Sequence, residues 1–167
     1  MAHASTHPEA HSALVEAVRP DMRHVCDVRA EVAPPLVIGQ GPRGERRIVP
    51  ILGGQVTGPG LSGDILPGGA DYQIIRPDGV AEIEARYTLR MADGALVHVV
   101  QRGLRHAAPE DMARLLRGER VPPERVYFRT SPSFETSVPG LAWLHRSLFV
   151  GFGQRLPDCV HVRVFAV

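Results

Sequence analysis

Residues 80–91 alternate apolar and charged side chains with a period of two, and this alternation constrains the fold more than any other feature of the chain. A β-strand places successive side chains on opposite faces, so the segment is predicted to be a strand with one buried face. Tight-turn signatures at 77–79 and 92–94 bound it, so segments 70–76 and 95–102 are predicted to pair with it as antiparallel neighbours. Its apolar face carries Ala81, Ile83, Ala85, Tyr87 and Leu89.

Further short segments have strand character and are separated by glycine and proline turns. Segment 109–118 instead has apolar residues at helical spacing and acidic residues in its first turn, which predicts the single short helix. Many short strands with glycine turns favour a closed antiparallel barrel over a sandwich or a βαβ fold. The predicted fold class is therefore all-β, mainly antiparallel, as a single closed small β-barrel with one short helix. The other predicted strands are 22–32, 45–55, 126–130, 134–136, 141–152, whose start also has helical character, and 160–167.

The length of 167 residues fits one domain, with residues 1–21 predicted as a flexible N-terminal arm and 22–167 as the barrel. The net charge of +1 gives no one-signed field, so neither nucleic acid nor a membrane surface is an expected partner. Neither a secretory signal nor a membrane-spanning run is recognised. Two cysteines far apart, Cys26 and Cys159, fit a reducing compartment. The sequence predicts a soluble cytoplasmic protein.

The chain contains neither lysine nor asparagine, so arginine supplies every permanent side-chain cation. Without lysine, Schiff-base chemistry and a phosphate-loop lysine are excluded. The bias also suggests a bacterial genome rich in G and C. The glycines do not form a dinucleotide-binding pattern, and the cysteine and histidine pairs lack a third ligand at a suitable spacing. No cofactor and no metal are therefore expected.

One candidate catalytic group lies on the central predicted hairpin. Asp71 and Gln73 share a face of one strand, and Glu84 and Arg86 share a face of the next. A suitable register would bring the four side chains together, and burial would raise the pKa of one carboxyl group while Arg86 keeps the other ionised. The alternative is that these charges form the solvated face of a sheet whose apolar face is the core.

A second candidate group consists of Arg129, Glu135, Trp143 and His145. An arginine, a carboxylate, an aromatic wall and an imidazole could surround a small anionic or carbonyl ligand. The alternative is an Arg–Glu pair that joins two loops, with Trp143 in the core and His145 on the surface. Tyr87 is a candidate ligand contact or a core residue with a polar tip.

Several motifs occur in order and at matching intervals over residues 22–167: RIVPI at 47–51, GG at 53–54, GPGLSG at 58–63, LPGGAD at 66–71, ARY at 85–87, YFRT at 127–130, FET at 134–136, WL at 143–144 and LFVG at 148–151. In these the chain resembles the family catalogued as domain of unknown function 3237. The resemblance implies a small β-barrel protein that has a central cavity and often forms oligomers. It also strengthens the prediction that Asp71 and Arg86 are site residues. Tyr72 stands where the family usually has Trp, and His145 where it usually has Asn.

Three functional hypotheses follow from these residues. The first is a cofactor-independent acid–base enzyme, an isomerase, cyclase or lyase, with Asp71 or Glu84 as proton carrier and Arg86 and Arg129 holding an oxyanion. The second is a carrier or sensor that binds a small molecule in the same cavity. The third is a structural subunit of a homo-oligomer, whose lumen should then be filled by side chains.

Overall fold

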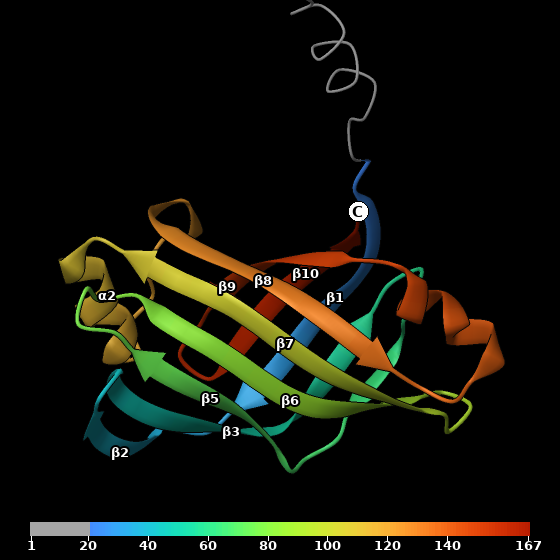
Figure 1. Cartoon of the computed structure of the whole chain (residues 1–167), viewed down its shortest axis with the longest axis horizontal. Helices are drawn as coiled ribbons and strands as arrows, with labels where there is room; N and C mark the ends of the chain where they lie inside the picture. The colour runs from blue at the N-terminus through green and yellow to red at the C-terminus, as the bar shows by residue number, and fades with distance from the viewer. Residues whose placement is uncertain (1–20) are drawn as a thin grey trace, which may run out of the picture.

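The computed structural model describes residues 21–167, which form a sheet of 10 strands closed into a barrel (Figure 1). The predicted arm, residues 1–21, lies outside the described residues except for Asp21. In chain order the elements are β1 (Arg23–Val32), β2 (Leu36–Gly41), β3 (Gly44–Thr57), β4 (Gly63–Ile65), β5 (Gly69–Ile75), β6 (Ala81–Met91), β7 (Leu96–Ala107), α2 (Pro109–Leu116), η1 (Pro123–Arg125), β8 (Val126–Glu135), η2 (Pro139–Arg146), β9 (Phe149–Arg155) and β10 (Cys159–Ala166).

The barrel closes because β1 pairs with β10 along one edge and with β3 along the other. From β10 the ladder runs through β9, β8 and β7 to β6, and the short strands β4 and β5 connect β6 back to β3. β2 adds a hairpin to the outer end of β3. Every one of these pairings is antiparallel. The predicted closed antiparallel barrel is confirmed, and closure leaves most strands without a free edge.

The predicted helix is confirmed as α2, while the segment 141–152 differs from its predicted single strand. Pro139–Arg146 forms the 3-10 helix η2, and only Phe149–Arg155 is extended. Pro139 lies at the start of η2, where a fixed φ and a missing N–H favour a helical turn. At its other end the Ser147 hydroxyl donates a hydrogen bond to the Trp143 carbonyl (3.1 Å). A short 3-10 turn, η1, precedes β8.

The two strands predicted at 126–130 and 134–136 are one continuous strand, β8. It runs through Pro132, which lies opposite Gln101 of β7. β8 pairs with β9 only at Arg129 and Thr130, so Pro132 lies beyond the part of β8 that is bonded on both edges. A proline is tolerated at such a position because a missing N–H there costs no ladder hydrogen bond.

The interior of the barrel has an apolar half and a polar half. The apolar half is capped by η2, which lies at the opposite end of the barrel from α2 (Figure 1). Two aromatic contacts hold it together, Phe134 against Phe149 and Trp143 against Phe149. The most deeply buried side chains of this half are Val25, Val56, Leu61, Leu89, Val97, Val99 and Val164. Burying so much apolar surface there supplies the stability that permits polar groups in the other half.

Candidate functional site

In the half of the lumen toward α2, a group of polar and charged side chains lies among apolar ones around an internal cavity of about 50 Å³. A closed barrel alternates inward and outward side chains along every strand, so each strand delivers its polar group to the lumen by its position in this alternation. The polar and charged lining residues are Asp71 and Gln73 on β5, Tyr87 on β6, Gln101 and Arg105 on β7, Thr130 on β8 and Arg155 on β9.

Space for this cluster comes from glycine on β9. An added Cβ at Gly153 would lie 2.5 Å from the ring of Phe128, so the aromatic side chain occupies the place that a side chain on β9 would take. A Cβ at Gly151 would lie 2.2 Å from the Thr130 hydroxyl. The arrangement allows side chains from β8 to enter the lumen beside β9.

Asp71 is held by two hydrogen bonds inside the barrel wall. Gln73 Nε2 donates to Asp71 Oδ2 (2.6 Å), and the backbone N–H of Glu84 donates to Asp71 Oδ1 (3.2 Å). Burial raises the pKa of Asp71 above its ordinary value, although Gln73, Arg105, the Glu84 N–H and Arg155 all act in the opposite direction. The carboxyl group therefore holds a proton more readily than an exposed aspartate does.

A second polar chain runs along the inner wall over the neighbouring strands β6, β7 and β8. The Tyr87 hydroxyl donates to Gln101 Oε1 (2.8 Å), and Gln101 Nε2 donates to Thr130 Oγ1 (3.0 Å). Burial raises the pKa of Tyr87, so its hydroxyl stays protonated at neutral pH. The chain fixes Tyr87 as a polar wall of the cavity.

Arg105 is a buried cation, with only 4% of its surface exposed. Its guanidinium lies over the ring of Phe128 (5.7 Å), and its Nε is buried without a hydrogen-bond partner among the described residues. Burial lowers the pKa of Arg105 to about 10, which still leaves its guanidinium charged at neutral pH. Burial also lowers the pKa of Arg155. Both line the cavity together with Asp71, yet no ion pair within 4.0 Å joins Asp71 to a described residue.

A mouth of about 400 Å³ lies beside α2. Val32, Val49, Gln73, Arg105 and Arg155 line both spaces, so the mouth adjoins the polar cluster. Its outer walls are partly apolar and come from the segment after β1 and from the end of α2: Pro34, Pro35, Leu115 and Leu116. A volume of this size accommodates a small metabolite.

The structure brings together three of the predicted site residues, Asp71, Gln73 and Tyr87. It does not bring Glu84 and Arg86 to them, so the predicted four-residue cluster is wrong. Asp71 lies opposite Ala85 in the ladder, and because Ala85 faces inward its neighbours on β6 must face outward.

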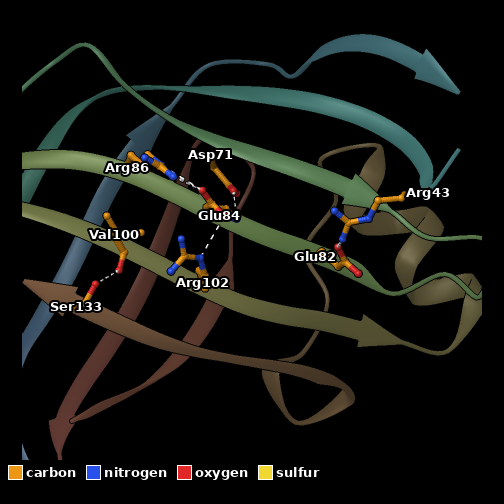
Figure 2. A network of polar contacts seen from close by, with 8 residues as sticks. All are labelled: Arg43, Asp71, Glu82, Glu84, Arg86, Val100, Arg102 and Ser133. Carbon is orange, nitrogen blue, oxygen red and sulfur yellow. Dashed lines mark hydrogen bonds and ion pairs between the residues drawn. The ribbon is translucent and has the colours of Figure 1, made fainter. Parts of the chain in front are cut away.

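Glu84 and Arg86 form an exposed network on the outer wall (Figure 2). Glu84 Oε1 accepts from Arg86 (2.6 Å), and Glu84 Oε2 accepts from Arg102 (3.2 Å). The hydrogen bonds from Arg86, which has the larger effect, and from Arg102 hold the pKa of Glu84 below its ordinary value. The two pKa directions expected for the carboxyl pair therefore occur, but on opposite sides of the barrel wall.

The second predicted group is dispersed as well. Arg129 lies over the rings of Tyr127 (5.2 Å) and Phe152 (4.4 Å), in the half of β8 away from Glu135. At a strand rise of about 3.3 Å per residue, the backbones of Arg129 and Glu135 are roughly 20 Å apart, so they form no Arg–Glu pair.

Trp143 and His145 lie on η2, at the apolar end of the barrel. Arg23 stacks over the Trp143 ring (5.0 Å), and exposed His145 accepts a hydrogen bond through Nε2 from the backbone N–H of Thr136 (3.2 Å). These contacts place Trp143 against β1 and His145 beside the end of β8, and neither residue lines the polar cavity.

Sequence reasoning missed Gln101, Arg105 and Arg155. The predicted strand ended at 102, whereas β7 extends to Ala107 and continues the inward alternation of Val97, Val99 and Gln101 to Arg105. An alternation count carried past Gly103 would have placed Arg105 in the lumen. Arg155 lies beyond the predicted end of its strand at 152.

Over residues 21–167, no group of three or more histidine, cysteine or acidic side chains is arranged to hold a metal ion. No helix of this part of the chain is long and apolar enough to cross a membrane.

Fold and site together define a small antiparallel β-barrel with an internal cavity that contains a polar cluster and adjoins a surface mouth at one end. Residues 20–167 match the family described as protein of unknown function DUF3237, and the chain belongs to that family. A UPF0311 protein of Rhodopseudomonas palustris is 44% identical over 147 residues, which cover 88% of this chain and 96% of that protein. A UPF0311 protein of Clostridium acetobutylicum is 39% identical over 144 residues, 86% of this chain and 91% of the relative.

Solved structures share the barrel. The crystal structure of the conserved protein of unknown function from R. palustris superposes with a TM-score of 0.85 at 43% identity, covering 89% of this chain and 99% of the other. A β-barrel-like protein from Acinetobacter baumannii gives 0.78 at 36% identity, over 89% and 97%. An enzyme from Penicillium herquei gives 0.63 at 18% identity, over 88% and 98%, which shows the fold alone.

Proposed function

We propose that the barrel binds a small organic molecule through its mouth beside α2 and that Asp71 transfers a proton to or from it. The observation that carries this proposal is the placement of Asp71: a carboxyl group inside the barrel, held by Gln73 and the Glu84 N–H, facing a cavity that it shares with Arg105, whose Nε has no hydrogen-bond partner among the described residues. Proton carriers in enzymes are positioned in this way, in clefts that shift their affinity for the proton.

Each neighbour has a distinct role in this proposal. Gln73 orients the carboxyl group, because its Nε2 hydrogen bond fixes one oxygen and leaves the group turned into the lumen. Arg105 and Arg155 stabilise negative charge that develops on an oxygen of the substrate when the proton moves. Raised proton affinity brings the pKa of Asp71 closer to neutral pH, which favours exchange of a proton in either direction.

The reaction class that fits is a proton shift on carbon or oxygen, as in an isomerisation, cyclisation, addition or elimination. Such reactions need a positioned acid or base and a stabilised oxyanion, and the lumen offers side chains for both. Of the two predicted proton carriers, Asp71 and Glu84, this proposal keeps Asp71. It gives the oxyanion-holding role predicted for Arg86 and Arg129 to Arg105 and Arg155. The purely structural alternative predicts a lumen filled by side chains. The mouth beside α2, which shares Gln73, Arg105 and Arg155 with the internal cavity, favours ligand binding over that alternative.

The proposal is tested by solvent proton exchange. The protein is incubated in D₂O with a panel of unsaturated and 2-oxo carboxylic acids, and deuterium incorporation is followed by ¹H NMR. Wild type is expected to accelerate exchange for at least one compound, and Asp71→Asn to lose about 10²- to 10⁴-fold of that rate while still binding it. Glu84→Gln, on the outer wall, is the matched control and should keep the wild-type rate.

If compounds bind in the lumen but none exchanges protons, the barrel is a carrier or sensor and not an enzyme. If Asp71→Asn exchanges protons as fast as wild type, Asp71 is not the proton carrier. The homo-oligomeric state and the cytoplasmic location stay predictions, and sedimentation of the purified protein tests the first of them.

A further inference from the structure

Arg105 and Arg155 are the arginines that line both the lumen and its mouth without an ion pair among the described residues. The charged residues that line the two spaces are Arg47, Arg105, Arg117 and Arg155 together with Asp71 and Asp158. Glu45 pairs with Arg47 and Glu119 pairs with Arg117, so the cations that can attract an anion into this space are Arg105 and Arg155.

These arginines differ in how far their donors are already used. Arg47 forms an ion pair with Glu45 beside the mouth. Arg155 donates to the backbone carbonyls of Cys159 (3.2 Å) and Pro157 (3.4 Å). Arg105 is the most buried of them, and its Nε has no hydrogen-bond partner among the described residues. Arg105 is thus the arginine whose buried Nε has no partner among the described residues, and it also lies deepest in the site.

A buried cation without a partner is costly, because burial removes the water that solvated it. Asp71 does not offset this cost as a direct counterion, because no ion pair within 4.0 Å joins them and both oxygens of Asp71 accept hydrogen bonds from other groups. Both groups instead line the same cavity. A buried Arg105 without a direct counterion is therefore suited to bind a negatively charged oxygen of a ligand that lies between Arg105 and Asp71.

We infer that the ligand is an organic anion whose carboxylate is bound by Arg105 and Arg155 in the lumen, with its apolar part in the mouth against Pro34, Pro35, Leu115 and Leu116. The inference rests on the proposed function and names its substrate class. A carboxylate fits because a guanidinium presents paired donors that match its two oxygens. The apolar walls of the mouth favour an organic body over an inorganic ion.

The inference is tested with matched probes: benzoate, its neutral counterpart benzamide, and inorganic phosphate. Binding is measured by calorimetry and by backbone amide shifts in NMR. Benzoate should bind about 10- to 100-fold more tightly than benzamide, which is the range expected for hydrogen bonds to a charged group. The shifted amides should be those of Gln73, Arg105 and Arg155. Inorganic phosphate should bind more weakly than benzoate, because it has no apolar part for the mouth.

Three variants separate a ligand site from a structural role of the arginines. Arg155→Gln, at a half-buried position, should weaken benzoate by roughly 10-fold and leave benzamide unchanged. Asp71→Asn removes the only carboxylate of the internal cavity and should strengthen benzoate severalfold. Arg86→Gln, on the outer wall, is the control and should change neither the affinity for benzoate nor the affinity for benzamide.

The inference is overturned if benzamide binds as tightly as benzoate, if no probe shifts the lumen amides, or if Asp71→Asn weakens benzoate. If phosphate binds as tightly as benzoate, the claim that the apolar part of the ligand binds in the mouth is contradicted. These outcomes differ from a failure of the proposed function, in which benzoate binds as described but Asp71→Asn leaves proton exchange at the wild-type rate.

Discussion

Replacing Asp71 with asparagine should stabilise the folded protein at neutral pH. Asparagine has the same shape, and its carbonyl oxygen can still accept the Glu84 N–H. Its Nδ2 can donate to Gln73 Oε1 once the Gln73 amide turns over, so the second hydrogen bond is kept with its direction reversed. What the substitution removes is a charge from inside the barrel wall.

The sign follows from the pKa of Asp71, which burial raises in the folded protein. Below pH of about 4, the carboxyl group is protonated in the folded and unfolded chains alike, and its contribution to stability is fully present. That contribution is lost as the pH rises through the folded pKa, because the unfolded chain ionises more easily. Asparagine does not ionise, so the variant escapes this loss.

We expect the free energy of unfolding of Asp71→Asn to be about 0.5–2 kcal/mol higher than that of wild type at neutral pH. Gains of this size are usual when a residue that destabilises the fold for the sake of function is replaced. For a domain of this size each kcal/mol corresponds to a Tm increase of roughly 2–4 °C. Urea denaturation at several pH values measures the difference, which should disappear near pH of about 3. Glu84→Gln is the control with the opposite sign, because its arginine neighbours lower the pKa of Glu84.

A variant less stable than wild type at neutral pH would contradict this prediction, because it would mean that Arg105 and Arg155 stabilise the Asp71 carboxylate by more than burial destabilises it. A difference that persists at low pH would also refute it, since the effect would then come from shape and not from charge.

Three further predictions concern the scaffold around the site. Gly153→Ala should cost about 1–3 kcal/mol in urea denaturation, because the new Cβ would lie 2.5 Å from the Phe128 ring, and a loss below about 0.5 kcal/mol would contradict this packing. Asp111→Ala should cost about 1–3 kcal/mol, because its 2% exposed carboxylate pairs with Arg125 (2.8 Å) and anchors α2; a matching Arg125→Ala loss would support the pair, and an unchanged midpoint would exclude it. Cys26, buried and with its pKa raised by burial to about 12, should resist thiol reagents in the native state, and rapid labelling at neutral pH would contradict its placement.

The barrel could be predicted because its signals are local. The alternation along β6 and the Asp-Gly turns fix the pairing of β6 with β5 and β7 over short stretches of sequence. The helix α2 was predicted from spacing within its own turns. By contrast, η2 was not separated from β9, because its apolar residues fit a strand and a 3-10 turn equally well, and only Pro139 signals the helical start.

The site could be predicted only in part, because it depends on which face of each strand points inward. Alternation shows that Ala85 and Glu84 face opposite ways, but placing Asp71 on the side of Ala85 requires the pairing across the hairpin. Arg105 and Arg155 come from strands whose ends extend beyond their sequence signals. Their convergence on Asp71 is a product of barrel closure, which no local pattern contains.

The most direct test of the account is an NMR titration of the side-chain carboxyl carbons of Asp71 and Glu84 in one sample, with and without benzoate. The account predicts a pKa above the ordinary value for Asp71 and below it for Glu84, and a further rise for Asp71 alone when benzoate is bound, because a second negative charge then lies across the cavity. An Asp71 that titrates at or below its ordinary pKa and does not respond to benzoate would contradict the claim that the lumen is the functional site.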